Sequence, residues 1–81
     1  MLTIEYKKDF LKKISHIRDS LLKEKIKKQI EKVIDAPTNG KPMRYIRKNT
    51  REVNIPSFRL AYAYISQEEK IIFLEFYHKD K

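Results

Sequence analysis

The chain has 81 residues, with one Gly, three Pro, no Cys and a formal net charge of +8 from 19 Lys and Arg against 11 Asp and Glu. This length predicts a single domain over residues 1–81 with one thin hydrophobic core. The lack of Cys excludes disulfides and thiolate metal sites, and two widely separated histidines cannot make a His-rich metal motif, so we expect no metal and no cofactor. Neither a membrane-length apolar stretch nor a signal-peptide pattern is present. We therefore expect a soluble cytoplasmic protein with no membrane partner.

The first half of the chain has helical signals after one short strand. Residues 2–6 alternate between apolar and polar side chains, which predicts a strand with one buried face. Residues 7–17 change to helical spacing. Asp19 or Ser20 can cap a second amphipathic helix, which is predicted to end near residue 34. Two helices joined this closely predict an antiparallel helical hairpin.

The second half has strand signals. Residues 35–42 contain two of the three prolines and the only glycine, which predicts a loop between the helical half and the strand half. The later apolar and alternating runs predict a short strand over 43–47 and longer strands over 50–55, 58–65 and 71–77. Without the short strand over 43–47, these elements predict an α+β domain of order β-α-α-β-β-β, with the helical hairpin packed on one face of a small antiparallel sheet.

The basic residues divide into two blocks of different character. Residues 7–35 carry ten basic and five acidic side chains, most of the basic ones Lys, whereas residues 41–59 carry six basic and one acidic, most of them Arg. Lysines are typical of a solvated helix face, while the planar fork of Arg suits phosphate groups. The second block therefore favours a polyanionic partner such as nucleic acid.

The available side chains restrict the possible chemistry. The sequence has no glycine-rich phosphate loop, no Cys nucleophile and no carboxylate cluster of the metal-binding type. The remaining groups are Arg, Lys, His, Tyr and isolated carboxylates, and they suit cleavage of RNA by its own 2′-hydroxyl. This reaction needs positive charge near the phosphorane-like transition state and a proton donor for the leaving 5′-oxygen.

Candidate residues for that reaction gather at one end of the predicted sheet. Pairing Ile65 with Ile71 or Ile72 would put Arg59 opposite Tyr77 or His78. In either register Arg59 and His78 lie at the same end, within about one strand spacing.

The preceding turn decides which residues share the face of Arg59. A two-residue turn at Pro56-Ser57 would pair Glu52 with Ala61, which puts Glu52 on the face of Arg59 and Arg51 on the other face. A bulge at Pro56 would invert that assignment.

These residues also resemble a known family. The relevant segments are Gly40-Lys41-Pro42-Met43-Arg44-Tyr45, Thr50-Arg51-Glu52-Val53, Phe58-Arg59-Leu60-Ala61-Tyr62 and Phe76-Tyr77-His78-Lys79-Asp80. In this order, after a two-helix hairpin and in a chain of this size, they resemble the RelE/ParE toxin superfamily, most closely the RelE/StbE-type mRNA interferases. The resemblance extends over essentially the whole chain.

The resemblance implies a RelE-like fold and a toxin that enters the ribosomal A site, cuts mRNA and leaves a 2′,3′-cyclic phosphate. It implies a cognate RelB-like antitoxin in a hetero-oligomeric complex, with the ribosome and mRNA as further partners. Arg59 matches the family arginine at the scissile phosphate, and His78 matches a histidine that some members use as general acid. By the same resemblance, Lys41, Arg44 and Arg51 are RNA-binding candidates, and Lys79, which follows His78, is a further one.

The chain departs from the family at the general base. One branch has a catalytic glutamate where this chain has Met43, and another has two lysines where it has Thr50 and Glu52. Glu52 and Tyr77 are the candidates for the base, and electrostatic stabilisation without a strong base is a further possibility. Two other functions stay open: a ParE-like toxin that inhibits gyrase, and a basic RNA-binding module without catalysis.

Overall fold

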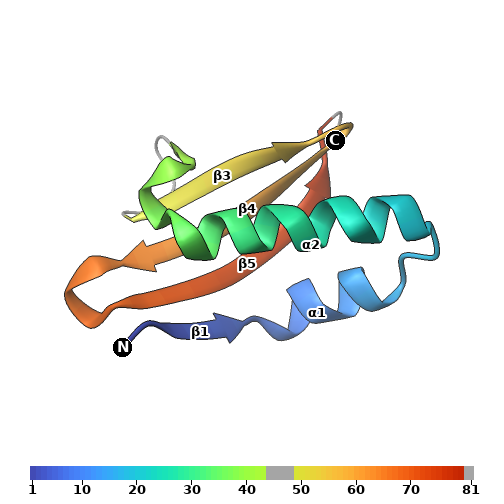
Figure 1. Ribbon diagram of the computed structural model, residues 1–81. Helices are drawn as coiled ribbons and strands as arrows, with labels where there is room; N and C mark the ends of the chain where they lie inside the picture. The colour runs from blue at the N-terminus through green and yellow to red at the C-terminus, as the bar shows by residue number, and fades with distance from the viewer. Residues whose placement is uncertain (44–48, 80–81) are drawn as a thin grey trace.

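The computed structural model describes residues 1–43 and 49–79. Its elements in chain order are β1 (Thr3–Tyr6), α1 (Lys8–Ser15), α2 (Ser20–Asp35), the 3₁₀ turn η1 (Pro37–Asn39), β2 (Lys41–Pro42), β3 (Thr50–Ile55), β4 (Phe58–Ile65), the 3₁₀ turn η2 (Ser66–Glu68) and β5 (Lys70–His78). The strands form a five-stranded sheet, and both helices pack on it (Figure 1). No helix in the described part of the chain is long and apolar enough to cross a membrane.

The sheet is mixed rather than antiparallel. Its strand order is β1-β5-β4-β3-β2, and the pairs from β2 to β5 are antiparallel as predicted. The prediction is wrong for β1, which pairs in parallel with β5, from Thr3 opposite Lys70 to Tyr6 opposite Phe73. Nearly the whole chain separates these two strands, so no local turn signal fixes their relative direction.

A bulge in β5 adjusts the pairing of the last two strands. At the turn Ile65 pairs with Lys70, one residue away from the predicted register. The register shifts between Ala61 and Tyr62, whose partners are Glu75 and Phe73, so Leu74 is the extra residue. Beyond this shift Arg59 pairs with Tyr77, one of the two partners that the sequence predicted.

The core lies between α2 and the sheet. Ile26 and Val33 of the predicted helical stripe are buried, and they meet Leu60 and Tyr62 of β4 in one apolar cluster. Asp19 caps α2 as predicted, because its carboxylate accepts hydrogen bonds from the backbone of Leu21 and Leu22. The two helices run in opposite directions, and α1 lies beside β5 where β1 has ended (Figure 1).

Two predicted elements differ from the structure. The first helix ends at Ser15 rather than at residue 17, although Ile17 still packs against the core. The strand predicted over 43–47 lies outside the described residues except for Met43, which follows the two-residue strand β2. Met43 continues the ladder by one bond, donated from its backbone N–H to the carbonyl of Thr50 at 3.0 Å.

Candidate active site on the open face of the sheet

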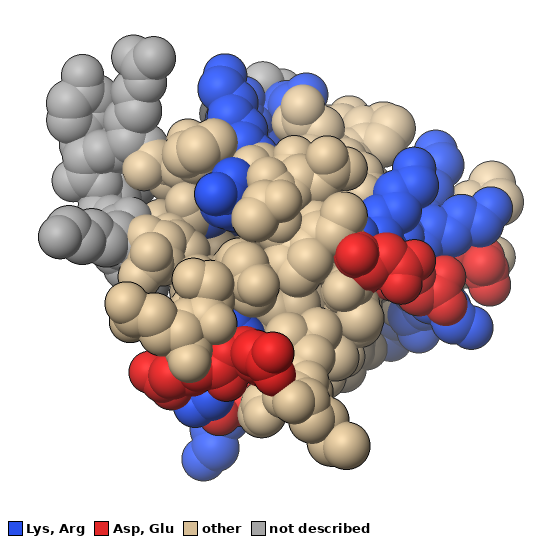
Figure 2. All heavy atoms as spheres, turned by 60° about the vertical axis from the view of Figure 1, so that its left-hand side comes forward, with Lys and Arg blue, Asp and Glu red and all other residues tan. Residues whose placement is uncertain are grey.

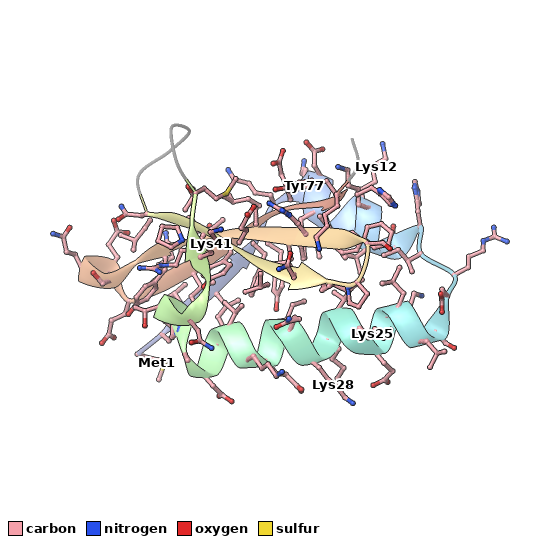
Figure 3. The ribbon with its side chains drawn as sticks, turned by 90° about the horizontal axis from the view of Figure 1, so that it is seen from above. Met1, Lys12, Lys25, Lys28, Lys41 and Tyr77 are labelled. Atoms are coloured by element: carbon pink, nitrogen blue, oxygen red, sulfur yellow. The ribbon has the colours of Figure 1, made fainter. Side chains whose placement is uncertain are left out.

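Three of the predicted site residues form a connected cluster on the face of the sheet away from α2, here called the open face. Arg59 Nη1 lies 2.7 Å from Glu52 Oε1, and the Tyr77 hydroxyl donates to Glu52 Oε2 at 3.0 Å. The three residues come from three adjacent strands, β3, β4 and β5. Figure 3 shows Tyr77 on the side of the sheet away from α2. A cation and a phenol therefore both lie within hydrogen-bonding distance of one carboxylate.

Local sequence features produce this arrangement. Pro56 and Ser57 make the predicted two-residue turn, with Ser57 at φ 70°, so that Asn54 pairs with Arg59. Glu52 then pairs with Ala61, which puts Glu52 and Arg59 on the same face as diagonal neighbours. The backbone N–H of Lys79 donates to the carbonyl of Ser57 at 3.0 Å, which ties the end of β5 to the turn.

Burial differs within the cluster. The Glu52 side chain is 16% exposed, while that of Arg59 is 40% exposed, so the carboxylate lies deeper than the guanidinium. Arg59 Nε is buried and has no hydrogen-bond partner among the described residues. The guanidinium thus uses one edge for Glu52 and keeps donor capacity for a further acceptor.

The environment of Tyr77 raises the pKa of its hydroxyl above the usual value of 10.0. Burial is the largest cause, and the hydrogen bond to Glu52 and its negative charge act in the same direction, whereas Arg59 lowers the pKa of this group. Tyr77 is therefore a neutral O–H donor at neutral pH.

Two basic candidates lie near the open face. Lys41 pairs with Glu52 across the β2–β3 ladder, so both side chains leave the same face, and Lys41 is exposed. Lys79 directly follows β5 and is also exposed. Arg44 lies outside the described residues.

Arg51 lies on the opposite face, as the alternation predicted. Its Nη1 donates to the carbonyls of Thr38 and Gly40 at 2.9 and 2.8 Å. These bonds fasten the η1–β2 segment to β3, so the structure gives Arg51 a local structural contact.

His78 is at the predicted end of the sheet, but it faces the other way from Tyr77. Because neighbouring side chains of a strand alternate, His78 shares the face of Phe58, its partner across the β4–β5 ladder. The two rings meet edge to face, with centroids 5.0 Å apart. The sequence argument placed the residue at the right end of the strand but did not include this alternation.

Helix α1 lies close to Glu75 of β5, a proximity that the sequence did not predict. Lys12 and Lys13 of α1 line a hollow of about 160 Å³ together with Asp9, Leu74 and Glu75. Glu75 pairs with Ala61 and so belongs to the open face. Local sequence carries no signal for this proximity, because the place of α1 depends on the distant pairing of β1 with β5.

Comparison with known proteins supplies the family. A sequence profile for the family described as "ParE toxin of type II toxin-antitoxin system, parDE" matches residues 4–81. None of the curated proteins matches the sequence.

Solved structures supply the fold. The toxin in the intact RelBE toxin–antitoxin complex of E. coli matches with a TM-score of 0.81 and 18% identity, covering 100% of both chains. A chain of the RelBE2 toxin–antitoxin complex from Mycobacterium tuberculosis matches with a TM-score of 0.75 and 17% identity, covering 99% of this chain and 93% of that one. The conserved hypothetical protein HP0892 from Helicobacter pylori matches with a TM-score of 0.57 and 26% identity, covering 99% and 97%. At these identities the likeness to the RelE structures shows a shared fold, and with the family profile it shows that the chain belongs to the ParE toxin family, within the RelE/ParE superfamily of type II toxins.

Proposed function

We propose that this type II toxin is a ribosome-dependent, metal-independent endoribonuclease that cleaves mRNA in the A site and so inhibits translation in the cytoplasm. The observation that supports this proposal is the hydrogen-bonded cluster of Glu52, Arg59 and Tyr77 on the open face. It contains the three kinds of group that RNA cleavage by 2′-hydroxyl attack requires: a base, a cation and a proton donor.

The proposed roles follow from the chemistry of each side chain. Glu52 accepts the proton of the attacking 2′-hydroxyl, and the oxygen closes on phosphorus to form the 2′,3′-cyclic phosphate. Arg59 stabilises the negative charge that develops on the phosphoryl oxygens. Tyr77 gives its proton to the leaving 5′-oxygen, a role that its raised pKa suits because the hydroxyl stays protonated.

Tyr77 replaces His78 as the proton donor in this proposal. The His78 ring packs against Phe58 on the face opposite Arg59. Tyr77 pairs with Arg59 and already joins its hydrogen-bonded cluster. A scissile phosphate held by Arg59 would therefore lie nearer to the phenol than to the imidazole.

The remaining basic candidates serve binding in the proposal. Lys41 and Lys79 are exposed near the open face and would contact phosphates on either side of the cut. Arg44 stays a candidate for the same role. Arg51 is a candidate only if RNA reaches the segment that it fastens, since its guanidinium is bonded to Thr38 and Gly40.

We further propose that an acidic RelB-like antitoxin binds the toxin in a hetero-oligomer and holds it inactive. Two of the matching structures are toxin–antitoxin complexes. The net charge of +8 favours a partner of opposite charge.

The direct test is cleavage of mRNA on purified ribosomes, with the cut positions mapped by primer extension. The wild-type toxin should cut mRNA only when ribosomes are present, and Arg59→Ala should lose most of this activity. Absence of any cut at every codon tested would contradict the proposal.

A second function is supported by a different observation. The matching family profile is that of ParE toxins, and the charge of Arg59 is compensated by Glu52 rather than left open for substrate. Both facts favour a toxin that inhibits DNA gyrase by binding it. A DNA supercoiling assay separates the two functions, because only a gyrase inhibitor blocks supercoiling while leaving ribosome-bound mRNA intact. RNA binding with neither effect would identify the basic RNA-binding module.

A further inference from the structure

The Glu52 carboxylate occupies the position at Arg59 where an external anion would bind. One carboxylate oxygen accepts from Arg59 at 2.7 Å and the other accepts from Tyr77 at 3.0 Å. Both oxygens are thus held by donors that come from neighbouring strands. Glu52 Oε1 thus takes the place at the guanidinium that one oxygen of a phosphodiester would take.

The backbone fixes this contact. The turn at Pro56-Ser57 makes Glu52 and Arg59 diagonal neighbours, and the bulge at Leu74 brings Tyr77 opposite Arg59. The carboxylate is also the deeper of the two charged groups, at 16% exposure against 40% for the arginine. An incoming phosphate therefore meets the guanidinium with its counter-ion already in place.

An anion can compete for this guanidinium. Because 40% of the Arg59 side chain is exposed, solvent screens this ion pair, and a phosphate fixed by other contacts can displace the carboxylate. Glu52 engages Arg59 only through Nη1, and with 40% of the side chain exposed the guanidinium can donate to a second acceptor.

We propose that Glu52 is an intramolecular competitor that sets the affinity of the open face for RNA phosphate. This inference rests on the proposed function insofar as it takes RNA as the anion. Binding replaces the Glu52 carboxylate by a phosphate at Arg59. An isolated phosphate therefore binds with little net gain in free energy, whereas RNA that is held by additional contacts binds more tightly. The same exchange releases Glu52 from Arg59, which frees the carboxylate to accept the proton of the 2′-hydroxyl.

The test measures binding without cleavage. The probe is a fluorescein-labelled, fully 2′-O-methylated RNA oligonucleotide, which lacks the attacking hydroxyl, and fluorescence anisotropy gives its Kd. Glu52→Gln should bind about threefold to tenfold more tightly than wild type, because it removes the competing charge but keeps the shape. Glu75→Gln is the matched control: it makes the same change in net charge on the same face, and the structure shows no ion pair between Glu75 and Arg59.

The salt dependence gives a second readout. In the wild type, the phosphate replaces the Glu52 carboxylate at Arg59, so one anion is exchanged for another. The cation that leaves the phosphate is balanced by one that the freed carboxylate attracts, and this contact gives no net release of counterions. In Glu52→Gln the phosphate meets an uncompensated arginine, and the slope of log K against log salt should become steeper by about 0.7. Glu75→Gln should leave the slope close to that of the wild type.

A double-mutant cycle shows whether the gain acts through Arg59. The tighter binding of Glu52→Gln should disappear in the Arg59→Ala background. Equal tightening by Glu52→Gln and Glu75→Gln, or a gain that persists without Arg59, would overturn the proposal.

Cleavage is measured separately, in single turnover on ribosome-bound mRNA. If no variant cleaves but Glu52→Gln still binds more tightly through Arg59, the competition stands and the endoribonuclease proposal fails. If the wild type cleaves but Glu52→Gln does not bind more tightly, the competition is overturned and the nuclease stands. If no variant binds the RNA probe, the competition is overturned, and the cleavage assay on ribosomes alone decides the endoribonuclease proposal.

Discussion

Arg59 has the central place in the cluster because it combines a fixed charge with partial exposure. Its ion pair with Glu52 holds the guanidinium at the surface of the open face, and 40% of its side chain remains accessible. An arginine that is both oriented and reachable is suited to a phosphate whose charge increases during the reaction. Arg59 and Tyr77, its partner across the β4–β5 pair, can each be tested by substitution.

Replacing Arg59 tests the stabilisation of charge. We expect Arg59→Ala to lower the single-turnover cleavage rate by about 10²–10³, the usual effect of removing one such donor. Arg59→Lys should recover only part of the activity, because an ammonium keeps the charge but lacks the planar fork. Since the ion pair is partly exposed, thermal unfolding should change little in either variant. Cleavage at the wild-type rate in Arg59→Ala would remove this residue from the mechanism.

Replacing Tyr77 tests the proton donor. We expect Tyr77→Phe to lower cleavage by about 10²–10⁴, and His78→Ala to leave it within about threefold of wild type.

The pH profile checks the same assignment. The acid must be protonated, so activity is lost as pH rises through its pKa, and burial together with Glu52 raises the pKa of Tyr77 above 10.0. This limb should therefore stay flat between about pH 6 and 9. A large loss in His78→Ala with a descending limb near neutral pH would restore His78 as the acid.

At the scale of elements, the η1–β2 segment that follows α2 is held by contacts to the sheet. The buried Tyr62 hydroxyl donates to the Pro37 carbonyl at 2.7 Å and accepts from the Gly40 N–H at 3.0 Å. Arg51 adds its two bonds to Thr38 and Gly40. Gly40 is required here for its size, because a Cβ at this position would collide with the Tyr62 ring and hydroxyl. These contacts fix β2, which carries Lys41 on the open face.

Two substitutions test this packing. We expect Gly40→Ala to destabilise the protein by about 1–3 kcal/mol through overpacking. Tyr62→Phe should cost a similar amount, because it leaves a buried N–H without its acceptor. The two residues touch, so the double variant should lose less than the sum of the single losses. Urea denaturation gives these values, and strictly additive losses would show that the two residues are not coupled.

Signals within a few residues of one another predicted most of these elements correctly. The Asp19 cap, the Pro56-Ser57 turn and the side of Glu52 each follow from local patterns, and the structure confirms them. The parallel pairing of β1 with β5 was not predicted, because it joins the two ends of the chain. The pairing of Arg59 with Tyr77 was predicted from a register that was wrong at the turn, and the bulge at Leu74 restored it. Bulges have no reliable local signal, so the opposite orientation of His78 became visible only in the structure.

For the whole molecule, charge is distributed unevenly between its parts. Where β1 begins and β4 turns into β5, acidic and basic side chains lie together (Figure 2), as in the ion pair of Lys70 with Glu5. This contact raises the pKa of Lys70. Along α2, by contrast, Lys25, Lys28 and Lys32 form no ion pair with any described residue. These lysines are therefore available to a partner on the helical side.

A groove beside α2 offers the basic surface where we expect the antitoxin to contact the toxin. It encloses about 280 Å³ between the helix and the β3–β4 turn, and its lining is formed by Lys25, Lys28, Gln29, Lys32, Asn54, Ile55 and Pro56. The exposed Pro56 provides an apolar wall over the fully buried Ile55, and Gln29 bridges the two sides by donating to the Asn54 carbonyl at 2.7 Å. Lysines around an apolar wall suit an acidic amphipathic segment better than a bare phosphate chain.

Charge removal on the two sides of α2 tests this assignment. We expect Lys25→Gln/Lys32→Gln to weaken antitoxin binding by at least about tenfold in calorimetric titration, because two cations near a partly desolvated interface are lost. Lys23→Gln/Lys27→Gln is the matched control: it removes the same charge from the same helix outside the groove, so its effect should be limited to the general attraction that salt screens. Equal weakening by both pairs would show that the antitoxin responds to net charge alone, and the groove would then have no part in its recognition.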